Sequence, residues 1–258
     1  MGIVNVTPDS FSDGGRYQSG VRAIEHALQL IADGADMLDI GGESTRPGAL
    51  AVSVEQELER VLPVVEGLAA CGVPISVDTA KPDVMAAAIR AGADMVNDVN
   101  ALRAEGALEV VAGANVALCL MHMQGEPRTM QHQPLYRDVV AEVGDFLAQR
   151  VASLEQAGIA RERMVVDPGF GFGKMLEHNL LLLRHLERFA RMGVPVLAGL
   201  SRKSMLGTLT GLAVEHRMLP SVAAAVIAAM KGARIIRVHD VKETRQALQI
   251  VSAVEGAA

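Results

Sequence analysis

The chain has 258 residues, a formal net charge of −6 and 50% hydrophobic residues, with no Trp, two Tyr and five Phe. Because aromatic residues are so few, the core must be built mainly from Val, Ile, Leu, Ala and Met. The acidic balance and the absence of a basic run argue against a nucleic-acid partner. No apolar run reaches the ~20 residues that a membrane-spanning helix needs, so we expect no membrane partner either.

The two cysteines, Cys71 and Cys119, lie far apart in the sequence and in no spacing typical of metal ligands. We predict free thiols, as in proteins of a reducing compartment. The N-terminus lacks the basic stretch and apolar segment of an export signal. These features together predict a cytoplasmic protein.

Short apolar runs alternate with longer segments whose apolar residues recur every three or four positions, the pattern of amphipathic helices. The short runs predict strands over residues 3–6, 37–40, 75–77, 95–97, 116–121, 164–166, 196–199 and 235–238. The longer segments predict helices over residues 21–32, 54–70, 81–91, 136–157, 176–191, 219–231 and 244–254.

This alternation predicts an α/β fold with a parallel sheet, because each parallel connection needs a crossover. Eight such units in one compact length favour a closed (β/α)8 TIM barrel, and a doubly wound open sheet is the alternative. No linker, low-complexity tract or charge block divides residues 1–258, so we expect a single domain.

Polar residues follow every one of the eight predicted strands. The richest of these segments are NVTPDSFSDGG at residues 5–15, DIGGESTRPG at 39–48 and DPGFGFGK at 167–174. A single Asp or Asn after a strand is as often a helix cap, but capping alone does not account for all eight. In a barrel, chemistry gathers where strands end, so the sequence predicts a site at that end.

The first of these segments is longer and more polar than a plain turn requires. Its eleven residues end in Gly-Gly, which favours a mobile lid. Asn5 stands at the strand tip, where its side-chain oxygen could bind Mg²⁺, a cation that prefers oxygen ligands and substrate phosphates.

Asp78, Asn97 and Asp167, on three different strands, complement the N–H donors of a flat amino-pyrimidine heterocycle, although Asp78 could instead cap a helix. Lys203 could donate to a ring carbonyl or nitrogen. Arg237 and His239 alternate along the last strand and so share one face. With Arg46 and a metal at Asn5 they could hold a diphosphate, because the planar arginine group donates two N–H bonds at once.

Two motifs give weaker signals. The glycine-rich run at residues 169–174 lacks the spacing of a phosphate-binding loop, because Pro168 and Met175 stand where that motif needs Gly and Ser or Thr. His122 lies between two methionines, which is more typical of a packed core histidine than of a ligand.

Six runs in the chain resemble dihydropteroate synthases, a family of pterin-binding enzymes. They lie at residues 2–15, 39–48, 76–79, 167–174, 201–205 and 236–241. The resemblance extends over essentially the whole chain, and the first two runs together with Ser-Arg-Lys-Ser at 201–204 are its most specific part.

This resemblance implies a (β/α)8 barrel that forms a homodimer and acts in folate biosynthesis. The implied reaction condenses p-aminobenzoate with 6-hydroxymethyl-7,8-dihydropterin diphosphate in the presence of Mg²⁺, and gives 7,8-dihydropteroate and diphosphate. Sulfonamides, which mimic p-aminobenzoate, would compete with it.

Roles for individual residues follow from the same resemblance. It implies Mg²⁺ binding by Asn5, diphosphate binding by Arg46, Arg237 and His239, pterin binding by Asp78, Asn97, Met121, Asp167 and Lys203, p-aminobenzoate binding by Thr45, Pro47, Phe172, Lys203 and Ser204, and catalytic roles for Asp9, Asp78 and Lys203.

Two other functions remain open from the sequence. A methyltetrahydrofolate-using methyltransferase has a similar pterin pocket but needs no diphosphate site, so Arg237 and His239 argue against it. A non-catalytic pterin-binding paralogue would be expected to lose lid or pocket residues, yet Asp9, Phe11 and Asp13 are all present.

The chain departs from the family pattern in two places. It begins at the first strand, without the usual short N-terminal extension, so we expect a less well plugged barrel bottom. Asn100 stands where Arg or Gly is common, with no consequence that the sequence reveals.

Overall fold

In the computed structural model, which describes residues 1–7, 15–44, 48–126 and 129–256, short parallel strands alternate with helices along the chain. The strands are β1 (Gly2–Asn5), β2 (Leu38–Gly41), β3 (Ile75–Asp78), β4 (Met95–Asp98), β5 (Ala117–Met121), β6 (Met164–Asp167), β7 (Leu197–Ala198) and β8 (Ile235–Ile236). All eight overlap the predicted strands.

The strands close into a barrel. β1 to β6 form one continuous parallel sheet in chain order, and β7 pairs with β8. A parallel bridge between Val166 and Val196 joins β6 to the β7 side, and another between Gly2 and Val238 joins the β8 side to β1. The amide of Ile3 donates to the carbonyl of Val238 at 3.0 Å across this second seam. The predicted (β/α)8 barrel is therefore confirmed, and a doubly wound sheet with two free edges is excluded.

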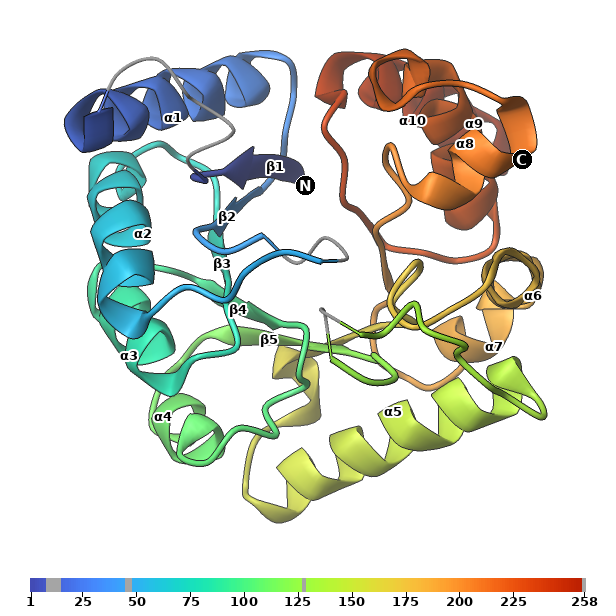
Figure 1. Cartoon of the computed structure of the whole chain (residues 1–258), viewed down its shortest axis with the longest axis horizontal. Coiled ribbons are helices and arrows are strands. Elements are labelled where there is room, and N and C mark those ends of the chain that lie inside the picture. The colour runs from blue at the N-terminus through green and yellow to red at the C-terminus, as the bar shows by residue number, and fades with distance from the viewer. Residues whose placement is uncertain (8–14, 45–47, 127–128, 257–258) are drawn as a thin grey trace.

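Helices surround the strands on the outside and follow the chain order around the ring (Figure 1). They are α1 (Gly15–Ala32), α2 (Val54–Leu68), α3 (Pro82–Arg90), α4 (Ala107–Ala112), α5 (Val139–Gln156), α6 (Leu176–Arg184), α7 (Leu186–Ala190), α8 (Ser204–Thr210), α9 (Met218–Met230) and α10 (Val241–Glu255), with 3-10 turns at Arg161–Arg163 and Val214–His216. Their inner faces form one large apolar cluster with the outward side chains of the strands. No helix among the described residues is both long and apolar enough to cross a membrane.

Several helix predictions need correction. The helix predicted from residue 21 begins at Gly15, and the one predicted over 176–191 is two helices that divide at His185. α4 and α8 have no counterpart among the predicted helices, because helices of six and seven residues complete too few turns to show a helical period.

Successive side chains of a strand point to opposite faces, so every second residue enters the barrel lumen. Met95, Cys119, Val165 and Leu197 pack together near the amino ends of their strands, and Met1, Met37, Ala117 and Ile235 lie partly buried against them. We call this apolar group the lumen floor.

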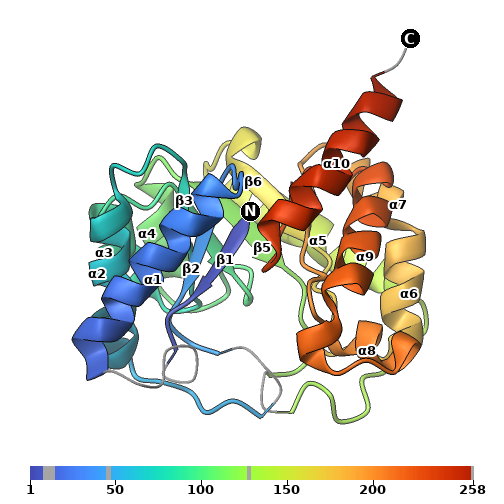
Figure 2. The ribbon, with the colours of Figure 1, turned by 90° about the horizontal axis from the view of Figure 1, so that it is seen from above.

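The lumen residues at the other end of the strands are polar. Two positions beyond Met95, Val165 and Ile235 stand Asn97, Asp167 and Arg237. In Figure 2 the segments after β2 and β5 run along the lower edge, while α10 extends from the opposite end. The fold thus separates an apolar floor from a polar mouth.

Candidate active site

Arg237 joins two carboxylates at the mouth of the lumen. Its Nε donates to Asp39 Oδ2 at 2.5 Å, and its Nη2 donates to Asp78 Oδ2 at 2.8 Å. Asp39 is fully buried, and its Oδ1 has no hydrogen-bond partner among the described residues. Two neighbouring strands, β2 and β3, and the residue that follows β8 therefore meet in one ion cluster, which we call the lumen cluster.

The amide of Asn97 extends this cluster to β4, since its Nδ2 donates to Asp39 Oδ2 at 3.2 Å. The strand register explains the proximity: Asn5 pairs with Gly41, Gly41 with Asp78, and Asp78 with Asn97. Because Gly41 has no side chain, the space between the side chains of Asn5 and Asp78 stays open. A Cβ at Gly41 would lie 3.5 Å from the Cβ of Asp78.

A second polar group comes from β6 and the segment after β7. Asp167 is buried, and its Oδ1 accepts from the amide of Gly169 at 2.7 Å. Lys203 donates its Nζ to the carbonyl of Phe170 and lies 4.5 Å from the ring centroid of Phe172. The lysine charge acts on Asp167, and so does the charge of Arg237, which places the two groups in one electrostatic environment.

Burial controls the protonation of these residues. It raises the pKa of Asp78 to about 7, against the opposing charge of Arg237, and the charge of Asp39 raises it further. Burial also raises the pKa of Asp167, with the charge of Lys203 opposing. The pKa of Lys203 falls to about 8 for the same primary reason. Three carboxylates and two cations thus share a poorly solvated mouth, where pKa values near neutrality are typical of functional sites.

His239 lies beside this mouth. Its Nδ1 is 2.9 Å from Ser201 Oγ, and its backbone amide donates to the same oxygen at 3.2 Å. The neighbouring Arg202 has a left-handed backbone (φ 57°) and forms an ion pair with Asp240 at 2.5 Å. This ion pair joins the segments after β7 and β8, so it fixes His239 relative to Ser204, which begins α8 with an exposed side chain.

An apolar wall adjoins the polar groups. Met121 is buried in a small cluster with Val99, Met123 and Met130, and Phe172 packs partly exposed against it. Met121 pairs in register with Asp167, so this wall stands next to a carboxylate suited to a heterocycle edge. A flat ring could therefore lie on Met121 and face Asp167.

Not every predicted site residue can be placed. Asp9, Thr45, Arg46 and Pro47 lie outside the described residues, as do Phe11 and Asp13. The described site residues Asn5, Asp78, Asn97, Met121, Asp167, Phe172, Lys203, Ser204, Arg237 and His239 all lie at or beyond the carboxyl ends of the strands. Their individual roles stay predictions. Their position at one end of the barrel agrees with the location that the sequence predicts.

Asp39 is a site residue to which the sequence alone assigns no role. Its segment is among the polar ones, but Asp39 stands inside β2 rather than after it, and a buried carboxylate in a strand interior is itself an unusual signal. Lys174, at the end of the glycine-rich run, is buried and donates to the carbonyls of His122 and Phe172 at 3.2 and 3.0 Å. His122 is buried too, with its Nδ1 2.9 Å from Lys174 Nζ, as expected for a packed histidine.

The fold and the mouth together define a (β/α)8 barrel of the kind that binds a small polar ligand at the carboxyl ends of its strands. Comparison with known proteins specifies it further. Residues 1–239 match the family described as pterin binding enzyme. The dihydropteroate synthase of Escherichia coli (strain K12) is 54% identical over 254 residues, which cover 98% of this chain and 90% of that protein.

Solved structures agree with this match. The structure of Xanthomonas albilineans dihydropteroate synthase with 4-aminobenzoic acid is 55% identical, with a TM-score of 0.95 over 100% of this chain and 93% of that one. The Yersinia pestis dihydropteroate synthase in a sulfonamide drug complex is 51% identical, with a TM-score of 0.95 over 100% of this chain and 94% of that one. The chain belongs to the pterin-binding enzyme family, within its dihydropteroate synthases.

Proposed function

We propose that this protein is a transferase of folate biosynthesis that joins p-aminobenzoate to 6-hydroxymethyl-7,8-dihydropterin diphosphate, giving 7,8-dihydropteroate and diphosphate. The observation that carries the proposal is the lumen cluster. In it Asp78, expected to bind the pterin, lies 2.8 Å from Arg237, expected to bind the diphosphate. A substrate with a polar ring at one end and an anionic tail at the other matches this junction.

The ring end of the substrate would be recognised by hydrogen bonds in a poorly solvated site. Carboxylates of Asp78 and Asp167 can accept from amino and ring N–H groups, while Asn97 can both donate and accept. Lys203 in its charged form can donate to the ring carbonyl. Such bonds discriminate strongly, because a ligand without the matching groups leaves buried polar atoms unpaired.

The reaction replaces a C–O bond by a C–N bond at the exocyclic methylene carbon. The amine nitrogen of p-aminobenzoate forms the new bond and loses one proton, and diphosphate departs with the electron pair of the broken C–O bond. Arg237 and His239 would neutralise charge on the departing oxygen, which is the larger part of catalysis when a good leaving group is already present. The amine nitrogen of p-aminobenzoate is itself the nucleophile, so direct displacement needs no covalent enzyme intermediate.

Mg²⁺ is proposed as the cofactor, with Asn5 as its protein ligand. Within the described residues no group of three or more His, Cys, Asp or Glu side chains could hold a metal ion. A single amide oxygen nevertheless fits Mg²⁺, which keeps several waters and binds largely through substrate phosphates. When bound, the ion would supply Lewis-acid stabilisation to the leaving diphosphate.

The p-aminobenzoate subsite is proposed next to Phe172, with Lys203 on that ring and Ser204 exposed beyond it. Thr45 and Pro47 would complete this subsite on the basis of the family resemblance. The Yersinia pestis relative forms a complex with a sulfonamide drug, which supports sulfonamide binding to this protein.

Assembly and location are also proposals. A homodimer is supported by exposed apolar side chains on and between α8 and α9, which include Leu209, Leu212, Met218, Leu219, Ile227 and Met230. Sedimentation velocity would measure the state directly. A cytoplasmic location is supported by Cys71 and Cys119, which are both free thiols.

The deciding experiment follows diphosphate release from purified protein. Release should require Mg²⁺, the pterin diphosphate and p-aminobenzoate together, with 7,8-dihydropteroate formed in equal amount. Release that is independent of p-aminobenzoate would indicate a hydrolase. Pterin binding without any turnover would indicate the non-catalytic paralogue, and methyl transfer from methyltetrahydrofolate would indicate the methyltransferase.

A further inference from the structure

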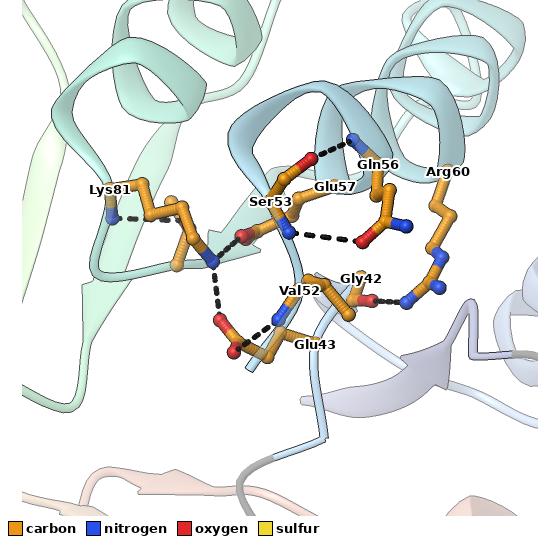
Figure 3. Close-up of polar contacts among 9 residues, drawn as sticks. Gly42, Glu43, Val52, Ser53, Gln56, Glu57, Arg60 and Lys81 are labelled. Carbon is orange, nitrogen blue, oxygen red and sulfur yellow. Dashed lines mark hydrogen bonds and ion pairs between the residues drawn. The ribbon is translucent and has the colours of Figure 1, made fainter. Parts of the chain in front are cut away.

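The connection between β2 and α2 is held at both ends by one side chain, that of Glu43. Glu43 lies two residues after the end of β2, and its Oε1 accepts from the backbone amide of Val52 at 3.1 Å (Figure 3). The start of the connection is therefore tied to its end, nine residues later. Thr45, Arg46 and Pro47 lie between these two points in the sequence.

The start of the connection is also tied to α2. Arg60 Nη1 donates to the carbonyl of Gly42 at 2.8 Å (Figure 3). Gly42 packs so closely on this helix that a Cβ there would lie 2.7 Å from Val61 Cγ2. At the other end, Ser53 and Gln56 form a capping box that fixes the first turn of α2. Both described ends of the connection thus have defined positions.

Lys81 links this arrangement to the next strand. It lies three residues after Asp78 and immediately before α3, and its Nζ donates to Glu43 Oε2 at 2.5 Å and to Glu57 Oε2. Glu57 comes from α2 and is fully buried, and its Oε1 has no partner among the described residues. We call Lys81, Glu43 and Glu57 the interhelix cluster (Figure 3).

Ion pairs between Lys81 and the two glutamates stabilise the interhelix cluster, which is partly shielded from solvent. Burial lowers the pKa of Lys81, but the hydrogen bonds that Lys81 donates to Glu43 and Glu57 outweigh this effect, so the net pKa is raised. Lys81 therefore remains an ammonium ion at neutral pH. Removing one of the three side chains would leave an uncompensated buried charge, which would destabilise the folded protein.

We propose that Lys81, Glu43 and Glu57 are positioning residues for the p-aminobenzoate subsite. They hold the described ends of the β2–α2 connection, at Glu43 and Val52, relative to the strand that carries Asp78. The family resemblance assigns p-aminobenzoate contacts to Thr45 and Pro47, which lie between those ends in the sequence. The inference rests on the proposed function. It assigns a role in that function to three residues that do not themselves contact a substrate.

The geometry makes this role selective for one substrate. Asp78, Asn97, Asp167 and Lys203 lie on strands or strand ends and contact the lumen rather than the interhelix cluster. The diphosphate keeps Arg237 and His239, although Arg46, also expected to bind it, belongs to the same connection. Displacement of the β2–α2 connection should therefore weaken p-aminobenzoate binding more than binding of the pterin diphosphate.

The experiment compares three variants in the diphosphate-release assay. Lys81→Met removes the shared cation. Glu43→Gln keeps an oxygen for Val52 but places an amide against the ammonium, and Lys231→Met is the matched control at a surface ion pair with Glu187. The first two should raise KM for p-aminobenzoate by about tenfold, with kcat within about twofold and a clearly smaller rise in the KM for the pterin diphosphate, as for a loss of binding that falls mainly on one substrate. The control should change neither KM.

A double variant separates positioning from mere stability. Lys81→Met with Glu57→Leu removes the buried unpaired charge and should restore the melting temperature. Glu43 still lacks its cation there, so the KM for p-aminobenzoate should stay raised. If that KM recovers together with stability, or if both KM values rise equally, the proposal is wrong. If Lys81→Met does not fold, Glu43→Gln and the double variant decide the question.

Failure of the proposed function would look different, because wild-type protein would then release no diphosphate. In that case direct binding of p-aminobenzoate, measured calorimetrically, tests the positioning role alone. Equal affinity in wild type and Glu43→Gln would overturn it.

Discussion

The lumen cluster and the interhelix cluster have the same arrangement of charges in different surroundings. Each places one cation between two carboxylates, and the cation side chain is 21% exposed at Arg237 and 22% at Lys81. Each contains one fully buried carboxylate, Asp39 or Glu57, with one oxygen that no described residue contacts by a hydrogen bond. The clusters differ in what their second carboxylate does: Asp78 faces the lumen mouth, while Glu43 closes a backbone connection.

This difference shows that one arrangement of charges can serve either to bind a ligand or to hold two parts of the backbone together. In the lumen cluster burial raises the pKa of Asp78 against the charge of Arg237, and the charge of Asp39 raises it further, so a ligand that donates N–H bonds would stabilise the ionised carboxylate. In the interhelix cluster the second carboxylate is already engaged by Val52, so no place remains for a ligand.

Arg237→Met should have the largest effect, because it removes the cation of the lumen cluster and a diphosphate-binding group at once. We expect kcat to fall by about 10²–10³-fold, as for loss of one group that stabilises a leaving charge. Steady-state diphosphate release measures this, with Lys231→Met as the control. Turnover near the wild-type level would show that the lumen cluster is structural only.

Lys81→Met should act on stability rather than on kcat. Leaving Glu57 buried without a cation should lower the free energy of unfolding by ~3–5 kcal/mol, measured by urea denaturation. Adding Glu57→Leu should return most of that loss. A single variant as stable as wild type would mean that the cluster is solvated in solution, contrary to its burial.

Asp39→Asn should weaken the orientation of Arg237 without removing any group expected to touch substrate. Loss of a charged hydrogen bond is worth ~1.5–3 kcal/mol, so kcat/KM should fall on the order of 10- to 100-fold. The KM for the pterin diphosphate should carry most of the change and that for p-aminobenzoate little. An equal change in both KM values would indicate that Asp39 supports the fold in general rather than the orientation of Arg237.

Asp78→Asn should change the pH dependence of stability. Because the folded-state pKa of Asp78 is raised from 3.8 to about 7, ionising it disfavours the folded state as the pH rises through that window. Wild-type stability should therefore fall over this range, and the variant should lose that part of the slope. Urea titrations across this pH window compare the two proteins, and identical slopes would contradict the raised pKa.

Much of the barrel could be predicted from the sequence because its strands are short apolar runs with a clear helical period between them. The same alternation predicts that Asn97 and Asp167 face inward at the ends of their strands, where they lie in the structure. α4 and α8 could not be predicted, since they are too short to show a period.

The site was harder to predict where contacts join distant residues. Asp39 and Arg237 are 198 positions apart, so nothing local indicates that they are partners. Lys81 and Glu57 resemble ordinary surface charges next to helices, and only their packing shows that Glu57 is buried. Patterns indicate which face a residue occupies, but not which residue of another element it meets.

The lumen floor gives the protein an internal chemical reporter. Cys119 is fully buried there, and burial raises the pKa of its thiol well above the usual value, whereas Cys71 is only half-buried. Since the thiolate is the form that reacts, alkylation should reach Cys71 first and Cys119 only when strands separate. Mass spectrometry of timed alkylation would therefore read out barrel opening at a single atom, without any introduced label.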